Sequence, residues 1–410
     1  MRILFIQPSN TVGGAEISLY QLVRSLRSLG FTFQVALRSP NNSPYVQMLE
    51  QYVEKVHALY LPTWQRKRVQ GMKNKVLTFL ARVKRGWYVV PTLRLARIIV
   101  KNRIDIVHTN GGLCPVGALA AFLTRRPHVW HVREQLGSDG LFPLALGDRT
   151  SANLFRRLSC ALICNSLYTA EFFKRRGGAP RVIHNGVNLD EFENSAERGA
   201  ALRNYLGLSI SDPVVGMVGN VRSTIKEHEL FLQAMALVSK EIPSAQFVIF
   251  GGSSDPNVSQ YASGLRVTAS RLQLSEHLTW AGMQSDIPAM MRSLDILVHP
   301  TSREGSGRVI MEAMAAGTPV VAVKSGGVQE LLQHGATGYL VEPRNVVALF
   351  EATIELLGHS ERRQQLGNAA KAYARKRFSH DLTIALIQAV YQEVVRNRTA
   401  ARQRYEYNGI

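Results

Sequence analysis

Two carboxylates on either side of a glycine-rich turn are the residues of this chain that most clearly suggest chemistry. Glu304 and Glu312 stand eight positions apart, with Gly305 and Gly307 between them and a helix of small residues after them. The glycines let backbone N–H groups approach an anion at a helix N-terminus, and the carboxylates accept hydrogen bonds from neutral hydroxyls. A phosphate flanked by hydroxyl groups describes a nucleotide sugar. The alternative is a surface loop that caps an Ala-rich helix.

Two cations follow another predicted strand in the same half of the chain. Arg222 and Lys226 come directly after the apolar segment 214–218. Such cations can neutralise a diphosphate, and an arginine can engage two oxygens at once. Alone they would be ordinary solvated loop cations, but beside the carboxylate turn they predict a diphosphate site.

A third, weaker signal is the Gly13-Gly14 turn between the first predicted strand and the first predicted helix. Two glycines allow close approach of the backbone to a phosphate. The turn is not a Gly-x-Gly-x-x-Gly fingerprint, and no acidic residue ends the strand at 31–37. A nicotinamide-dependent dehydrogenase is therefore disfavoured.

The formal net charge of +19 predicts an anionic partner. Residues 55–103 contain no acidic side chain. Within them apolar residues recur at helical spacing, at Met72, Val76, Phe79, Leu80, Val83 and Trp87. This pattern predicts a basic amphipathic helix that either binds an anionic membrane surface or packs on the core with a solvated basic back. Nucleic acid is not an expected partner, because no RNA- or DNA-binding motif accompanies the charge.

Other features bear on location and redox chemistry. The three cysteines are too few for a disulfide framework, and Cys160 and Cys164 are expected to be buried apolar residues. The apolar run at 1–8 is too short for a signal peptide, and no stretch reaches the roughly 18 apolar residues that span a bilayer. We expect a cytoplasmic protein, held at the inner face of the membrane if the basic region binds lipid.

Strands and helices alternate in two series along the chain. The first series has predicted strands at 2–7, 31–37, 104–108, 128–131, 161–164 and 181–184. The second has them at 214–218, 246–250, 278–280, 295–298, 319–323 and 338–341. A polar stretch from residue 185 to about residue 212 separates the series. We expect an α/β fold with two doubly wound Rossmann-like domains, residues 1–190 and 191–380, facing each other across a cleft.

Taken together, these motifs resemble those of the family 4 glycosyltransferases, retaining enzymes of the two-domain GT-B fold that use nucleotide sugars. The resemblance covers nearly the whole chain and is most specific over residues 280–345. It rests on Gly13-Gly14-Ala15-Glu16, Asn165-Ser166, the segment from Ile183 to Asn188, Arg222 with Lys226, Glu304 with Glu312, and Gly326-Gly327-Val328-Gln329-Glu330. The chain departs from the family pattern at Glu227, where glycine usually follows the lysine. Ser306 and Arg308 also stand where bulky apolar residues are more usual.

The resemblance implies a division of labour. Residues 1–190 would bind the acceptor and be joined by a C-terminal helix at 381–410, and residues 191–380 would bind the donor. Glu312 would accept hydrogen bonds from the ribose diol. Glu304 and the backbone of the turn after it would hold the donor sugar. The turn residues are Gly305, Ser306, Gly307, Arg308 and Val309.

The resemblance also implies catalytic roles. Arg222 and Lys226 would stabilise the diphosphate as the glycosidic bond breaks. Gly13 and Gly14 would let the N-terminal half approach the same phosphates. His131 matches a histidine that lies beside the donor sugar, and His108 and His299 are secondary candidates. The candidates for contact with sugar or acceptor are Arg133, Glu134 and Asn185.

The implied reaction moves a sugar from UDP or GDP to an acceptor hydroxyl with retention of anomeric configuration. Such an enzyme of the hexosyltransferase type would act on a glycan or lipid-linked acceptor, in cell-surface polysaccharide or glycolipid biosynthesis. No obligatory cofactor or metal is expected, since no Asp-x-Asp-type motif appears. Two alternatives stay open: a nucleotide-sugar epimerase of the same fold, and a non-catalytic protein that binds anionic surfaces.

Overall fold

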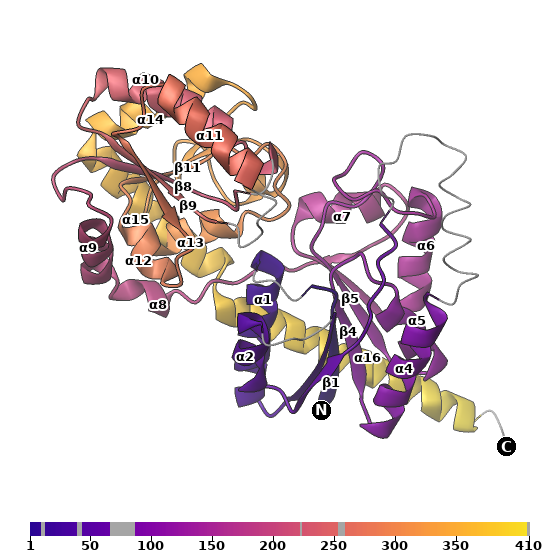
Figure 1. The fold of residues 1–410 in the computed structure, drawn as a ribbon. Helices are drawn as coiled ribbons and strands as arrows, with labels where there is room; N and C mark the ends of the chain where they lie inside the picture. Colours follow the sequence, from indigo (N-terminus) through magenta and orange to yellow (C-terminus); the bar gives the residue numbers. More distant parts are fainter. Residues whose placement is uncertain (10–12, 39–42, 66–86, 222–223, 253–258, 408–410) are drawn as a thin grey trace. The chain divides into compact units, whose positions relative to one another are not determined.

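The computed structural model describes residues 1–9, 13–38, 43–65, 87–221, 224–252 and 259–407 (Figure 1). Two predicted features lie outside these ranges. They are Arg222, which was predicted to bind the diphosphate, and residues 66–86 of the basic region. Contacts divide the chain into two compact units. The first is Met1–Asn185 with Thr383–Ile410, and the second is Gly186–Leu382.

The first unit is built on a seven-stranded parallel sheet. In spatial order its strands are β3 (Lys55–Ala58), β2 (Thr32–Leu37), β1 (Arg2–Gln7), β4 (Ile106–Asn110), β5 (His128–Val132), β6 (Ala161–Cys164) and β7 (Arg181–Val182). Apolar side chains from β1 are buried on both faces, as expected for a parallel sheet covered by helices. The sheet turns in opposite directions from β1 and β4, which makes that pair its topological switch point.

Helices cover both faces of this sheet. On one face lie α1 (Gly14–Ser28), α2 (Pro44–Glu50) and the long α16 (His380–Tyr407). On the other lie α4 (Val89–Lys101), α5 (Val116–Leu123), α6 (Asp148–Leu158) and α7 (Leu167–Lys174) (Figure 1). From α16, Ile387, Val390 and Tyr391 are buried against the first sheet, so the end of the chain is part of the first unit.

The second unit has a six-stranded parallel sheet. In spatial order its strands are β10 (Leu278–Gly282), β9 (Gln246–Phe250), β8 (Val214–Val218), β11 (Ile296–His299), β12 (Val320–Val323) and β13 (Tyr339–Val341). One face packs against α10 (His228–Glu241), α11 (Ser259–Arg271) and α14 (Val346–Gly358). The other packs against α8 (Asp190–Glu193), α12 (Ile287–Arg292), α13 (Arg308–Ala316) and α15 (Ser360–Arg377).

The polar stretch between the two series of strands is partly helical. It contains α8 and α9 (Ala196–Tyr205), and α9 packs against α12. The contact boundary falls at Asn185, inside the predicted linker and ahead of the predicted domain edge at residue 190. The reason is local: Val187 and Leu189 pack in the second core, and the Val187 N–H donates to the Phe378 carbonyl at 2.9 Å.

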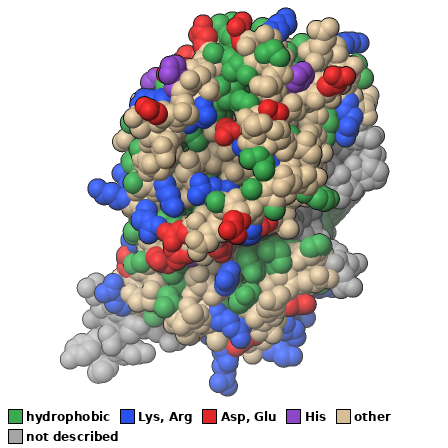
Figure 2. Space-filling view, turned by 90° about the vertical axis from the view of Figure 1, so that its left-hand side faces the viewer, with side chains coloured by type: hydrophobic (Ala, Val, Ile, Leu, Met, Phe, Trp, Pro, Cys, Tyr) green, Lys and Arg blue, Asp and Glu red, His purple; other side chains and the backbone are tan. Residues whose placement is uncertain are grey.

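Surface charge, cysteine burial and helix hydrophobicity are the remaining features of the described structure. On the face shown in Figure 2, Lys and Arg side chains are interspersed with Asp and Glu. Cys164 is buried, but Cys160 is exposed just before β6 begins, so the expectation of a buried residue was wrong there. None of the helices in the described part of the chain has both the length and the apolar character that crossing a bilayer requires.

Candidate functional site

The second sheet has its topological switch point between β8 and β11, and the predicted donor residues follow these two strands. The sheet runs outward from β8 through β9 and β10, and from β11 through β12 and β13. Ligands of open α/β sheets bind beyond the carboxyl ends of the strands at such a point. Lys226 ends the short helix η1 (Thr224–Lys226) after β8, and Glu304 lies in the loop after β11.

Lys226 and Glu304 form an ion pair at this edge. Lys226 Nζ lies 2.8 Å from Glu304 Oε2, and His299 Nε2 lies 3.4 Å from the same oxygen. The other carboxylate oxygen, Oε1, accepts the Gly307 N–H at 3.2 Å. Burial alone would raise the pKa of Glu304, but the Lys226 ammonium and the His299 ring outweigh burial and hold this pKa well below its usual value. Glu304 is therefore a fixed, ionised acceptor.

The residue after Lys226 explains one departure from the family pattern. Glu227 has a backbone φ of 53°, in the left-handed region that glycine adopts without strain. Its carboxylate accepts the Ser302 N–H at 3.2 Å and also bonds the Ser302 hydroxyl. These two bonds tie the loop after β8 to the loop after β11. They offset the strain that a glycine would avoid.

Glycines let the loops of this edge pack backbone against backbone. A Cβ on Gly327, in η3 (Gly326–Glu330), would overlap the Gly305 carbonyl oxygen. The Gly327 N–H also donates to the Glu304 carbonyl at 3.0 Å. Gly307 precedes α13 with a φ of 65°, and its N–H donates to Glu304 Oε1 at 3.2 Å. The start of a helix is a place where an anion or a hydroxyl can bind.

Glu312 and Arg308 form a second ion pair on the first turns of α13. Arg308 Nε donates to Glu312 Oε1 at 2.7 Å, and Glu312 is buried. Burial raises the pKa of Glu312, and the Arg308 guanidinium opposes part of that shift. Arg308 therefore turns toward Glu312 along the helix. Ser306 is buried in the preceding turn, and Val309 packs at the edge of the second core.

The first unit has a polar network at its own switch point, where β1 and β4 end. Gln7 Nε2 donates to Glu16 Oε1 at 2.7 Å, and Asn110 Nδ2 donates to Gln7 Oε1 at 2.5 Å. Burial raises the pKa of Glu16. A Cβ on Gly13 would come within 2.8 Å of Glu16 Oε2, whereas one on Gly14 would meet nothing within 4 Å. A side chain at the first glycine would therefore displace the Glu16 carboxylate, whereas one at the second would not.

Arg133 connects this network to two other predicted residues. Its Nε donates to Asn110 Oδ1 at 2.6 Å, and its Nη1 donates to Asn185 Oδ1 at 2.5 Å. Its Nη2 lies 3.5 Å from His131 Nδ1. Burial and the neighbouring Arg133 charge hold the pKa of His131 well below its usual value, so the ring is neutral at physiological pH.

Glu134 holds a loop in place. Its Oε2 accepts the Gly112 N–H at 2.7 Å and the Arg133 N–H at 3.1 Å. Burial raises the pKa of this carboxyl, and the backbone hydrogen bonds oppose the rise. The carboxylate thus fixes the loop after β4 beside the end of β5.

The sequence did not point to Gln7, Asn110 or Tyr391 as parts of this site. Tyr391 Oη lies 2.6 Å from His108 Nδ1, and the His108 and His131 rings lie 5.5 Å apart between centroids. The C-terminal helix α16 therefore reaches the predicted sugar-site histidine through one intermediate ring. The sequence signal for Gln7 and Asn110 was a polar residue at the end of β1 and of β4.

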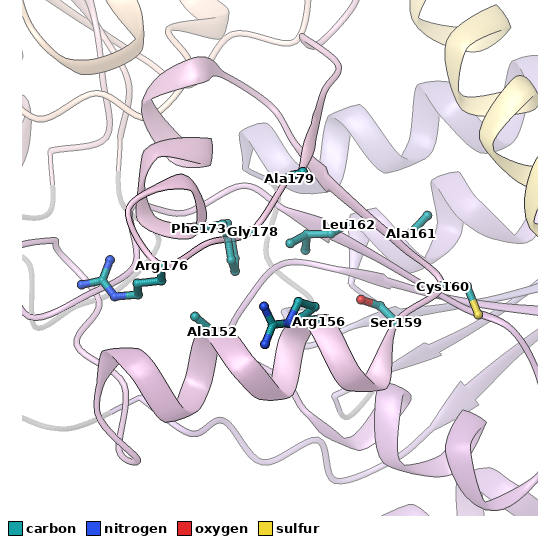
Figure 3. Close-up of a pocket in the computed structure, with 10 residues that line it drawn as sticks. All are labelled: Ala152, Arg156, Ser159, Cys160, Ala161, Leu162, Phe173, Arg176, Gly178 and Ala179. Carbon is teal, nitrogen blue, oxygen red and sulfur yellow. The ribbon is translucent and has the colours of Figure 1, made fainter.

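A separate cavity of about 250 Å³ lies beside α6 and α7 (Figure 3). It lies at the amino ends of the strands, whereas the polar network lies at their carboxyl ends. Its side chains come from α6, the start of β6 and the turn after α7, and none is a predicted site residue. Arg176, on its rim, is already engaged, since it pairs with Asp148 at 2.8 Å and stacks on Phe172 at 4.4 Å. Arg156 lies in the last turn of α6, where a cation complements the helix C-terminus.

Two family models match successive parts of the chain. One, described as Glycosyltransferase Family 4, matches residues 12–191, and the other, described as Glycosyl transferases group 1, matches residues 201–373. Among curated proteins, the chain is similar to the D-inositol 3-phosphate glycosyltransferase of Mycobacterium tuberculosis, with 32% identity over 227 residues. That alignment spans 54% of this chain and 45% of the relative, so the chain covers less than half of the relative's length.

Solved structures resemble nearly the whole chain. Anabaena HepE in complex with UDP has a TM-score of 0.80 and 26% identity, over 96% of this chain and 100% of that one. Its complex with UDP and glucose has a TM-score of 0.78 and 25% identity, over 96% and 99%. Sucrose-phosphate synthase from Thermosynechococcus elongatus shares the fold, with a TM-score of 0.74 and 21% identity over 96% and 98%. The predicted α/β fold with two parallel sheets is confirmed.

Proposed function

The chain belongs to glycosyltransferase family 4, with the GT-B fold, and from this premise we propose that it transfers a sugar from a nucleoside diphosphate to an acceptor hydroxyl. The observation that carries the proposal is the Lys226–Glu304 pair at the switch point of the second sheet, 2.8 Å between charged atoms. A fixed cation and an ionised acceptor side by side suit a diphosphate joined to a sugar.

The donor-binding roles follow the order of groups in a nucleotide sugar. Glu312 accepts hydrogen bonds from the ribose hydroxyls. Lys226, with Arg222, binds the diphosphate, while Glu304 accepts hydroxyls of the sugar. Arg308 and Val309 begin α13 after Gly307, and the positive end of the helix dipole favours the same anionic ligand. Gly305 and Ser306 shape the turn between them.

UDP is the nucleotide we favour. HepE, the solved structure described above, was determined with UDP and with UDP-glucose, and it resembles 96% of this chain at 25–26% identity. GDP is the competing nucleotide. A thermal-shift screen of both nucleotides separates them, because the ligand that binds the folded state raises the melting temperature by mass action.

The reaction we propose retains anomeric configuration. The bond between the anomeric carbon and the β-phosphate oxygen breaks, and its electron pair goes to the phosphate, which Lys226 stabilises. The acceptor oxygen forms the new bond on the same face of the sugar, and its proton passes to the leaving phosphate oxygen. We do not assign Glu304 as a nucleophile, because the Lys226 ion pair and the Gly307 amide hold its carboxylate in place. The remaining lone pairs of its oxygens can still accept sugar hydroxyls.

In the first unit, we propose that His131 contacts the donor sugar as a neutral ring. Arg133 and Asn185 act together toward the sugar or acceptor, because they are bonded at 2.5 Å. Glu134 acts through the loop that it holds. The turn at Gly13 and Gly14 lets the backbone approach the donor phosphates closely. The acceptor is a glycan or a lipid-linked sugar of polysaccharide or glycolipid synthesis.

We further propose a cytoplasmic location at the inner membrane face, with residues 55–103 binding anionic lipid. No metal or cofactor takes part, since Lys226 and the start of α13 supply the positive charge that a metal would bring. Turnover unchanged by EDTA supports this assignment. A loss of turnover that Mg²⁺ restores overturns it.

The deciding experiment measures nucleotide release from UDP- and GDP-sugars with and without an acceptor pool. Release that depends on acceptor, with an α-linked product from an α-linked donor by NMR, is the expected result. Sugar isomers without transfer would establish an epimerase instead. No turnover with any donor, together with binding to anionic vesicles, would establish a non-catalytic surface-binding protein.

A further inference from the structure

An apolar groove of about 520 Å³ opens on the first unit, between α4, α5 and α6. These three helices lie on the same face of the first sheet (Figure 1). The groove is lined chiefly by Val89 and Leu93 of α4, Phe122 and Leu123 of α5, and Leu154 and Leu158 of α6.

The groove exposes large apolar side chains to solvent. Leu93 is 50% exposed, Phe122 is 66% exposed and Leu123 is 56% exposed. Single exposed apolar residues are ordinary, but a contiguous patch around a concave surface marks a binding site. The two neighbours Val89 and Val90, at the start of α4, enlarge the exposed patch.

The groove offers little to a polar ligand. Trp64, in its wall, donates its indole N–H to the Gly112 carbonyl at 2.8 Å. Tyr88 donates its hydroxyl to the Thr63 carbonyl at 3.1 Å. These polar atoms are committed to backbone partners, and the remaining lining is almost wholly hydrocarbon. The matching ligand is therefore itself a hydrocarbon.

The surroundings of the groove are basic. The exposed cations are Arg94, Arg97 and Lys101 on α4, Arg125 after α5, and Arg149 and Arg157 on α6. Neither α4 nor α5 contains an acidic residue. On α6, Asp148 is paired with Arg176 at 2.8 Å. On the face shown in Figure 2, by contrast, Lys and Arg side chains are interspersed with Asp and Glu. The basic charge of the groove helices complements an anionic headgroup layer.

We propose that this groove docks the protein on an anionic phospholipid bilayer. Acyl chains enter the groove beside Leu93, Phe122 and Leu123, and the surrounding arginines bind headgroup phosphates. The proposal rests on the membrane association proposed above. It extends that association from residues 55–103 to α5 and α6, and gives it an apolar insertion point.

The test is co-sedimentation of the full chain with phosphatidylglycerol vesicles and with phosphatidylcholine vesicles. Wild type is expected to bind the anionic vesicles, and less so at high salt. Leu93→Glu with Phe122→Glu should lower the bound fraction by about tenfold or more. The milder Leu93→Ala with Phe122→Ala should lower it in the same direction, and both side chains are exposed enough to leave the fold intact.

Matched controls lie in the second unit. Ile210 is 67% exposed and Tyr205 is 82% exposed. Ile210→Glu with Tyr205→Glu makes the same change of charge and should leave vesicle binding as in wild type. Affinity for UDP, which the second unit is proposed to bind, should be unchanged in every one of these variants.

Every other outcome would contradict docking of the bilayer at this groove. Vesicle binding that survives both groove variants overturns it and leaves residues 55–103 as the membrane site. A wild type that binds neither vesicle overturns membrane association altogether, while donor turnover still judges the transferase separately. A groove variant that dissociates an oligomer, with vesicle binding kept, shows a contact between copies. A lowered melting temperature with vesicle binding kept shows internal packing.

Discussion

Replacing Lys226 by methionine removes the charge of a residue that is predicted to bind the diphosphate and keeps most of its side-chain length. In the structure, Lys226 Nζ lies 2.8 Å from Glu304 Oε2, and both side chains are partly buried. The substitution therefore has two effects. A bound diphosphate loses a charge-assisted hydrogen bond, and Glu304 keeps its negative charge without the neighbour that compensates it.

The size of the first effect follows from the chemistry of one contact. A hydrogen bond to a charged group contributes about 1.5–3 kcal/mol, which corresponds to a loss of about 10- to 150-fold in UDP affinity. The second effect adds to it, because the unpaired Glu304 carboxylate repels the diphosphate. Adding Glu304→Gln to Lys226→Met removes that repulsion, so the double variant should bind UDP more tightly than the single variant.

Isothermal titration with UDP measures both effects, since UDP carries the diphosphate without the sugar that Glu304 is expected to hold. Lys240→Met is the matched control: Lys240 is exposed in the last turn of α10, a helix whose first turn lies at the site edge. It should bind UDP as wild type does. An affinity for Lys226→Met within about twofold of wild type, with the far-UV spectrum unchanged, would refute the diphosphate assignment. A double variant weaker than the single one would refute the repulsion argument.

Three further predictions concern other residues. Glu312→Gln should weaken UDP binding by about tenfold, because a neutral amide accepts the ribose hydroxyls less strongly; unchanged titration isotherms would contradict the ribose role. Tyr391→Phe removes the hydroxyl 2.6 Å from His108, so the free energy of unfolding should fall by about 1 kcal/mol and turnover should fall more than UDP affinity; wild-type turnover would leave Tyr391 a purely structural residue. His128→Gln tests pH dependence: burial lowers the pKa of His128 from 6.5 to about 3, so the unfolded chain takes up the proton first and wild type loses stability as pH falls below 6.5. The stability difference, wild type minus variant, should therefore shrink by about 2.5 kcal/mol from about pH 6 to pH 4 in urea titrations, and a difference independent of pH would refute the burial argument.

Strands with continuous apolar runs were the most predictable part of the fold. β1 was predicted at its observed bounds, because the strand is covered on both faces and all its residues between Arg2 and Gln7 are apolar. β3 was missed, since its side chains are half-buried or exposed and it lies in a basic segment. α9 was missed because it begins in a polar stretch and rests on α12 through few apolar residues, among which the buried Gly199 gives no helical signal.

The candidate site also contains some contacts that the sequence could predict and others that it could not. That Lys226 and Glu304 lie together could be predicted, because each follows a strand beside turns and glycines, and the structure pairs them at 2.8 Å. The ligand-binding roles of these two residues and of Glu312 stay predictions. The Gln7–Asn110 bond and the contact of Tyr391 with His108 could not be predicted, because 103 and 283 residues separate the partners. Pairs of this kind depend on strand order, which a single sequence leaves open. Asn165-Ser166 is a different case: Ser166 caps α7 through a capping box with Thr169, so this part of the family pattern has a folding role.

Carboxylates at both switch points hold loops in place through hydrogen bonds. Glu134 accepts the Gly112 amide, Glu227 accepts Ser302, and Glu304 accepts the Gly307 amide that starts α13. Because Glu304 holds this amide, removing its side chain outright would release the turn before α13, in addition to losing the sugar contact that we propose. A loss of turnover on truncation therefore combines two losses. The isosteric amide, which still accepts from Gly307, separates the position of the turn from the charge of the carboxylate.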